Sequence, residues 1–138
     1  MKIKIIISCF LLILFLGGCN VKAEYDFLYS VDEISAIEIV QVDEESQEGF
    51  QQTMLAEIED IEAFLLEFNK LDCYSNYTDP IGIENGDIVI KVIYSNGDYE
   101  MIGCTGQARC EDGTFDNYVG RRYFEQEEYN NLIDSYTE

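Results

Sequence analysis

The fold is decided by the stretch IVIKVIYSNGDYEMIGC, residues 88–104. Its first seven residues are rich in β-branched side chains, which suit the pleated, half-buried surface of a strand. Its centre, residues 95–98, contains Asn96-Gly97, a strong hairpin signal because a type I′ turn needs positive φ at both central positions. Residues 99–104 predict the returning strand. We therefore expect an antiparallel hairpin here, with a turn at residues 84–87 leading into it.

Two further strands are predicted upstream of this hairpin. Residues 35–42 and 50–58 both alternate between apolar and polar side chains, which is the period of a half-buried strand. Residues 43–49, DEESQEG, predict an acidic connection between them. Carboxylates suit Ca²⁺, but the order of residues differs from an EF-hand loop, so a solvated loop is favoured over a cation site.

Two amphipathic helices are predicted by apolar residues that recur at intervals of three and four. The first helix begins after Asp60, a favourable N-cap residue, and the second spans residues 125–136. Their apolar stripes predict core-facing sides and consist of Ile61, Phe64, Leu65, Phe68 and Leu71 in the first, and Tyr129, Leu132, Ile133 and Tyr136 in the second.

The remaining strands complete the predicted order. Residues 72–77 predict a short strand, and residues 114–124 predict another that is interrupted near Gly120. The order is β-β-α-β-β-β-β-α, without a βαβ repeat that carries a Gly-rich phosphate loop. We expect an α+β domain, with a mainly antiparallel sheet of about five or six strands and two amphipathic helices packed on it.

The N-terminus has a different character from the rest of the chain. Lys2 and Lys4 precede an uncharged run, Ile5–Leu16, in which only Ser8 is polar. This run is short for a membrane-spanning helix, which needs about 20 residues, and suits the apolar region of a signal peptide. Leu16-Gly17-Gly18-Cys19 follows directly.

This N-terminus resembles a bacterial lipoprotein signal that ends in a lipobox. The resemblance implies a signal peptide at residues 1–18, cleaved before Cys19, and a diacylglyceryl group on the Cys19 sulfur, with acylation of its amine by a fatty acid such as palmitate. Two or more buried acyl chains anchor a protein stably to a membrane. We expect a lipidated N-terminus and tether at residues 19–30 and a single α+β domain at residues 31–138.

A second resemblance lies in the mature part of the chain. The hairpin segment IYSNGDY, residues 93–99, and the ending RYFEQEEYNNLI, residues 122–133, resemble small Gram-positive lipoproteins of unknown function. In those proteins a strand ending in Tyr-Phe runs into a terminal helix. This resemblance implies a fold and carries no known active residues.

Charge and composition restrict the function. After residue 18 the chain keeps six basic residues and all 28 acidic ones, a formal charge of −22, which argues against nucleic acid or an anionic bilayer as a partner of the protein surface. The chain has no His, which excludes the usual Ser-His-Asp and Cys-His nucleophiles and His-based zinc sites. No CxxC motif is present, and we expect no cofactor and no metal.

Three cysteines remain besides Cys19, and their pairing is open. A disulfide between Cys104 and Cys110 would close a short loop, whereas Cys73 paired with either would tie the middle of the chain to the hairpin. An exported protein permits one disulfide and one leftover thiol. The alternative is three unbridged thiols.

The candidate binding residues are aromatic and basic. An exposed aromatic patch is expected from four tyrosines, and Arg121-Arg122 is the only basic doublet in the mature chain. The doublet suits an anionic ligand. Alternatively, it forms weak, exposed ion pairs with local carboxylates. The tyrosines of this candidate surface are Tyr74, Tyr77, Tyr118 and Tyr123.

These features predict a lipid-anchored protein on the extracytoplasmic face of the cell membrane. We expect a monomeric, non-catalytic binding or interaction module of the cell envelope, attached to the membrane through Cys19 and able to contact an envelope protein partner. The alternative is a small envelope hydrolase that uses paired carboxylates, which in a retaining glycosidase lie about 5–5.5 Å apart in a cleft.

Overall fold

The structure is a computed structural model that describes residues 20–76, 82–118, 120 and 122–138. The predictions for Cys19, Tyr77 and Arg121 therefore lie outside the described residues. The elements in chain order are β1 (Asn20–Lys22), a 3₁₀ turn η1 (Val31–Glu33), β2 (Ile34–Ser46), β3 (Gly49–Glu57), α2 (Ile61–Phe68), β4 (Cys73–Asn76), β5 (Ile88–Tyr94), β6 (Tyr99–Ile102), β7 (Gln107–Glu111), β8 (Thr114–Asp116), β9 (Arg122–Phe124) and α3 (Gln126–Thr137).

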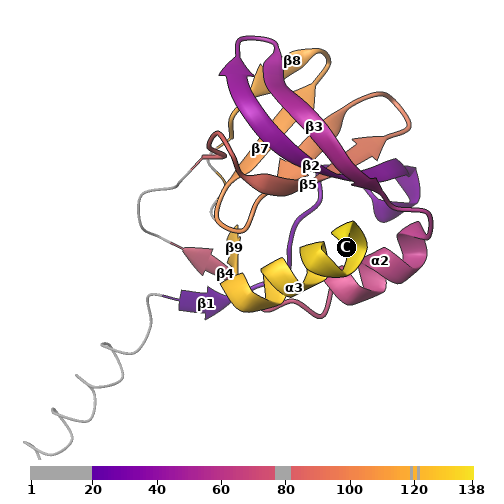
Figure 1. Ribbon diagram of the computed structural model, residues 1–138, viewed down its shortest axis with the longest axis vertical. Coiled ribbons are helices and arrows are strands. Elements are labelled where there is room, and N and C mark those ends of the chain that lie inside the picture. Colours follow the sequence, from indigo (N-terminus) through magenta and orange to yellow (C-terminus); the bar gives the residue numbers. More distant parts are fainter. Residues whose placement is uncertain (1–19, 77–81, 119, 121) are drawn as a thin grey trace, which may run out of the picture.

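The predicted α+β class is confirmed. Six strands form an antiparallel sheet in the order β3-β2-β5-β6-β7-β8, and the short strands β1, β4 and β9 form a second sheet in the order β1-β4-β9. Helices α2 and α3 lie side by side beneath the larger sheet (Figure 1). The smaller sheet lies at the end of this helical layer, where the described chain begins (Figure 1).

The larger sheet buries apolar side chains on both faces. One face packs against the helices and the segment 25–29, and its centre includes Ile39, Ile90 and Ile102, all without exposed surface. The opposite face holds a smaller cluster that includes Val42 and Val89. Successive residues of a strand point to opposite faces, so a strand in a sheet that is covered on both faces needs apolar residues at every position. This explains why residues 88–94 form a nearly continuous apolar run.

The two edges of the larger sheet approach one another through side chains. Phe50 at the start of β3 and Phe115 in β8 have ring centroids 5.3 Å apart in an edge-on arrangement. Such aromatic pairs stabilise beyond the area that they bury. The sheet is therefore strongly curved, and the smaller cluster lies inside the curve.

Both predicted helices are confirmed, with small changes at their ends. The Asp60 carboxylate accepts from the Ala63 N–H at 2.9 Å and caps α2. Glu125 lies just before α3 and accepts from the N–H groups of Glu127 and Glu128. The predicted stripes face the core: their members are buried or pack against the larger cluster, as the three-and-four spacing requires.

The central hairpin is confirmed, but its predicted type I′ turn is wrong. The Tyr94 carbonyl accepts from the Gly97 N–H at 3.0 Å, so Ser95 and Asn96 are the central residues of the turn, and Gly97 follows them with a φ of 91°. Asn96 instead uses its side chain, whose Oδ1 accepts from the Asp98 N–H at 2.9 Å. A two-residue turn with positive φ at both positions occurs at Asp112-Gly113, φ 51° and 76°, between β7 and β8.

Three other expectations require correction. Residues 107–111, not predicted as a strand, form β7 in the interior of the larger sheet. The single strand expected at residues 114–124 is two strands, β8 and β9, that belong to different sheets. The acidic connection expected at residues 43–49 is mostly strand, because β2 continues to Ser46 and pairs with Gly49 across a short turn.

The described part of the expected tether pairs and packs with the domain. Residues 20–22 form strand β1 and pair with β4. The Ala23 N–H donates to the Cys73 carbonyl at 2.9 Å. Tyr25 and Phe27 then pack against the larger core cluster.

A buried carboxylate holds this N-terminal segment on the sheet. Glu100 has no exposed surface, and its two oxygens accept from the Tyr25 hydroxyl at 2.5 Å, the Leu28 N–H at 2.5 Å and the Tyr94 hydroxyl at 2.8 Å. Burial, and next the charge of Glu100, raise the pKa of Tyr25 and of Tyr94, so both hydroxyls keep their protons. We call this arrangement the Glu100 clamp.

The clamp predicts a large stability effect for Glu100→Gln. The amide keeps the shape but places an NH₂ donor among three donors, so we expect the free energy of unfolding to fall by about 2–4 kcal/mol in urea denaturation. Glu111→Gln, on the exposed end of β7, is the matched control and should change it by less than about 0.5 kcal/mol. Equal effects in the two variants would contradict the clamp.

Candidate functional site

The predicted binding residues separate into two places. Tyr74 and Tyr123 are cross-strand partners in the smaller sheet, with rings stacked 5.4 Å apart and 27° between their planes. Tyr118 and Arg122 lie elsewhere, around a pocket that the strands β7 and β9 border. Among the described members of the set, Tyr74 and Tyr123 contact each other, and Tyr118 contacts Arg109.

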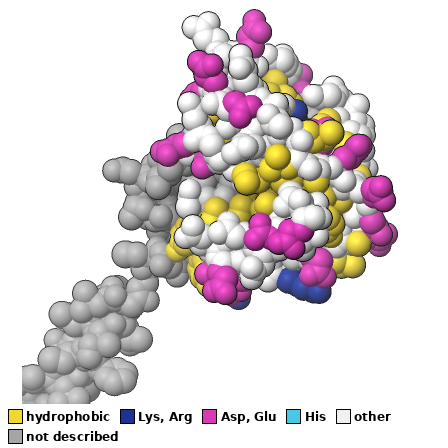
Figure 2. Space-filling view, viewed as in Figure 1, with side chains coloured by type: hydrophobic (Ala, Val, Ile, Leu, Met, Phe, Trp, Pro, Cys, Tyr) yellow, Lys and Arg dark blue, Asp and Glu magenta, His cyan; other side chains and the backbone are white. Residues whose placement is uncertain are grey.

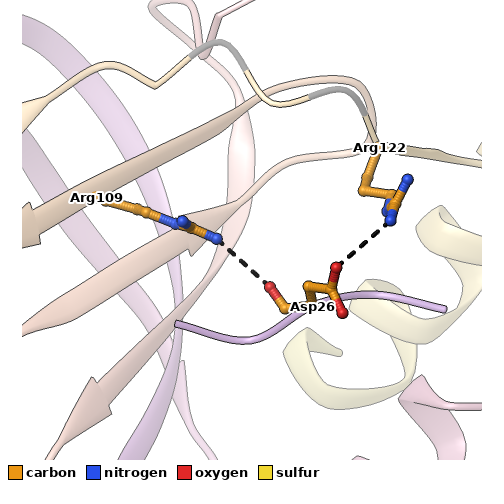
Figure 3. A network of polar contacts seen from close by, with 3 residues as sticks. All are labelled: Asp26, Arg109 and Arg122. Atoms are coloured by element: carbon orange, nitrogen blue, oxygen red, sulfur yellow. Dashed lines mark hydrogen bonds and ion pairs between the residues drawn. The ribbon is translucent and has the colours of Figure 1, made fainter. Parts of the chain in front are cut away.

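The pocket brings together both arginines whose placement is described. Its volume is about 300 Å³, and we call it the arginine pocket. Figure 3 shows the Arg109 and Arg122 side chains converging on Asp26 from opposite sides. The residues that line the pocket are Tyr25, Asp26, Gln107, Arg109, Tyr118, Gly120 and Arg122.

Three segments that are distant in sequence position these side chains. Gln107 and Arg109 are two residues apart on β7 and so point to the same face, and the register places Arg109 opposite Glu100 of β6. Arg122 comes from β9 in the smaller sheet. Asp26 lies between the two N-terminal contacts of the Glu100 clamp, so the clamp fixes the backbone that carries it.

The polar contacts inside the pocket are long. An Arg109 Nη atom lies 3.4 Å from the Asp26 carbonyl oxygen, and an Arg122 Nη atom lies 3.5 Å from the Asp26 carboxylate. The Arg109 guanidinium also lies over the Tyr118 ring, 4.9 Å from its centroid. Its Nε is buried and has no acceptor among the described residues.

The Gln107 side chain, as it is placed, leaves no room for a Cβ atom at Gly120. A Cβ atom at position 120 would lie 1.4 Å from the Gln107 side-chain oxygen, which no rotation of a few degrees relieves. The Gln107 amide in turn donates to the Arg122 carbonyl at 2.9 Å. Gly120 and Gln107 therefore hold the segment that carries Arg122 against β7.

The pocket is basic in a strongly acidic chain. Acidic side chains are spread over the face of the molecule seen in Figure 2, and few basic ones appear there. Guanidinium groups pair well with carboxylates and phosphates because their donors form a planar fork. Binding of an oxyanion is the chemistry that this arrangement supports.

Two buried carboxylates lie elsewhere, on β6 and its turn, and neither lines the arginine pocket. The Asp98 carboxylate accepts from the Tyr29 hydroxyl at 2.6 Å and from the Asp112 N–H at 2.9 Å. These contacts lower the pKa of Asp98. Glu100 is occupied by the three donors of the clamp. Both carboxylates hold chain segments together in this structure.

A wider hollow of about 630 Å³ lies beside the N-terminal segment. Its apolar lining includes Phe27, Phe68 and Phe124, and its polar lining includes Lys22 and Glu24. Lys22 is engaged by Asp72, which raises the pKa of Lys22. In the part of the chain that is described, no group of three or more Cys, Asp or Glu side chains is placed to hold a metal ion.

The three described cysteines are free, so the Cys104–Cys110 disulfide is not present. Cys110 lies opposite Tyr99 in the β6–β7 register, five residues before Cys104 along the partner strand. At about 3.4 Å per residue this separates the two by about 17 Å, whereas a disulfide needs Cα atoms within about 7 Å. Cys104 also packs on the helical face, away from the smaller cluster.

Sequence reasoning missed Asp26, Gln107, Arg109 and Gly120 as site residues. Asp26 was hidden in the expected tether, and β7 lacks the apolar alternation of a strand. One signal was available: Asp112-Gly113 predicts a two-residue hairpin, which would have made strands of its flanks and placed Arg109 on one of them.

Comparison with family models, with curated proteins and with solved structures finds no match for this chain. What the protein does must therefore be inferred from its own residues.

The thiol chemistry gives a direct check of the cysteine placement. Burial raises the pKa of Cys73 to about 11, so at pH 8 roughly one Cys73 thiol in a thousand is the reactive thiolate. We expect iodoacetamide to spare Cys73 in the native protein at pH 8, and labelling to rise with pH while the fold persists.

In denaturant without reductant, all three thiols should be labelled, as read by peptide mass spectrometry. Labelling of Cys73 alone in denaturant would show a Cys104–Cys110 disulfide and contradict the free thiols.

Proposed function

We propose that this protein is a lipid-anchored lipoprotein on the extracytoplasmic face of the cell membrane, and that its domain is a non-catalytic binding module of the envelope. Cys19 is the proposed lipid attachment site, and the protein acts as a monomer that can also contact an envelope protein. The observation that carries the binding proposal is the arginine pocket, where two guanidinium groups and an aromatic ring face one concavity.

The anchoring proposal rests on the N-terminal sequence. The Leu16-Gly17-Gly18-Cys19 motif follows an apolar run that is too short for a comfortable span. No helix among the described residues is long and apolar enough to cross a membrane.

The position of β1 determines how far a lipid on Cys19 would hold the domain from the membrane. Asn20 already belongs to β1, whose ladder pairs it with Asn76. A flexible tether of ten residues would reach about 17 Å, from about 5–6 Å multiplied by the square root of ten. A lipid on Cys19 would instead attach one residue from the smaller sheet and hold that sheet close to the bilayer.

Lipidation is tested by Cys19→Ala in the full chain expressed in a bacterial host. We expect the variant to keep its signal peptide, to lose incorporation of labelled fatty acid, and to change its distribution between membrane and soluble fractions. Cys110→Ala removes a half-buried thiol and leaves the motif intact, so it is the matched control. Unchanged processed size and fatty-acid labelling in Cys19→Ala would overturn the anchoring proposal.

A further inference from the structure

The described cations of this chain differ in how well they are partnered. Lys22 and Lys70 have carboxylate oxygens at 2.5 Å and 2.8 Å, and Lys91 lies 4.6 Å from the centroid of an aromatic ring. The two arginines approach Asp26 only at 3.4 Å and 3.5 Å. In a chain with 28 acidic residues, both described arginines therefore have only long contacts to acceptor oxygens.

We infer that the arginine pocket binds the oxyanionic group of a small soluble molecule, a carboxylate or a phosphate, and that this group replaces the Asp26 carboxylate on Arg122. The inference rests on the proposed function only in taking the domain to be a binding module. It names the ligand class of that module.

Asp26 can give way without disturbing the fold. Its side chain is 87% exposed and lies 3.5 Å from Arg122, and an ion pair of this kind contributes little because water screens it. Its backbone is fixed on both sides, since the Tyr25 hydroxyl and the Leu28 N–H both donate to Glu100. The carboxylate therefore swings into solvent while the Asp26 carbonyl stays at Arg109.

Arg109 is oriented for the same purpose. The Tyr118 ring lies against its guanidinium group at 4.9 Å, which restricts the plane of the group and leaves its edge for hydrogen bonds. A bound oxyanion at the exposed Nη groups of Arg109 and Arg122 would take up donors that reach Asp26 only at 3.4 Å and 3.5 Å. Two N–H donors of one guanidinium group can bind one oxyanion, a bidentate geometry that the single ammonium group of lysine does not provide.

The size of the pocket limits the ligand. A volume of about 300 Å³ is at the lower end of the range for small-molecule sites, about 300–1,000 Å³. It suits a small carboxylic acid or phosphate ester. The formal charge of the chain repels anions at long range, so binding is expected to be weak and to depend on ionic strength.

The test is an NMR titration of the full chain in an uncharged, phosphate-free detergent, with inorganic phosphate, acetate and, for comparison, chloride. We expect phosphate or acetate to cause saturable shifts of the Arg109 Nε–H signal and of the Gly120 amide. Chloride at equal ionic strength should cause neither. Vesicles with and without an anionic phospholipid form a separate arm.

Four variants sharpen the result. Asp26→Asn removes the competing carboxylate and should tighten binding about 3- to 10-fold. Arg122→Gln, and Arg109→Lys, which keeps the charge but loses the fork, should each weaken it at least about 10-fold. Lys70→Gln removes a surface charge that is paired with Glu67 and should leave the affinity within about twofold. Urea denaturation confirms that each variant folds.

Several outcomes would overturn the inference. The inference fails if no saturable shift appears with up to about 50 mM added anion, a concentration well above the roughly millimolar dissociation constants of weak ligands. Loss of binding in Lys70→Gln equal to that in Arg122→Gln, or no tightening in Asp26→Asn, would mean non-specific charge effects. Shifts with anionic vesicles alone would assign the site to a lipid headgroup and reject a soluble ligand. None of these results alters the Cys19→Ala test, so the two proposals fail separately.

Discussion

The buried carboxylate of Glu100 is the constraint on which the rest of this structure depends. Removing a carboxylate from water costs several kcal/mol unless it is paired and hydrogen-bonded. Glu100 meets that cost with two tyrosine hydroxyls and one backbone N–H, and the N-terminal segment supplies two of these three donors. The sheet therefore cannot bury this face well unless residues 25–28 lie across it. One charge in a strand turns a segment that looks like a linker into part of the core.

The arginine pocket follows from that placement. Tyr25 and Leu28 are fixed by the clamp, so Asp26 must lie between them, at the junction of β7 and the smaller sheet. Arg109 sits opposite Glu100 in the β6–β7 register, where the buried negative charge favours a cation nearby. Arg122 arrives with β9, held by the Gln107 contact that the absence of a side chain at Gly120 allows. A structural clamp and a candidate binding site thus share one set of residues.

The sequence predicts the parts of this fold that local periodicity controls. The stripes of both helices and the β-branched run of residues 88–94 have one dominant pattern each, and they are confirmed. Where the structure differs, long-range contacts decide: residues 107–111 become a strand because their neighbours pair with them, although Gln107 and Arg109 break the apolar alternation. The stretch 114–124 divides because its two ends pair with different sheets. The pocket combines three segments of this kind, so no local pattern could reveal it.

The same clamp would let the proposed lipid anchor fix the orientation of the domain relative to the membrane. A tether would separate membrane attachment from binding, because a flexible chain transmits no orientation. Here the chain enters β1 at Asn20 and carries Asp26 only six residues later, fixed by hydrogen bonds at both Ala23 and Tyr25. If Cys19 bears the lipid, the smaller sheet stays near the bilayer. Because Arg122 of the arginine pocket belongs to that sheet, the pocket would keep a defined distance from the bilayer and a defined orientation relative to it. The orientation of the pocket relative to the bilayer and the position of Asp26 in it would then depend on the same nine residues, Asn20–Leu28, so a substitution in this segment would alter both.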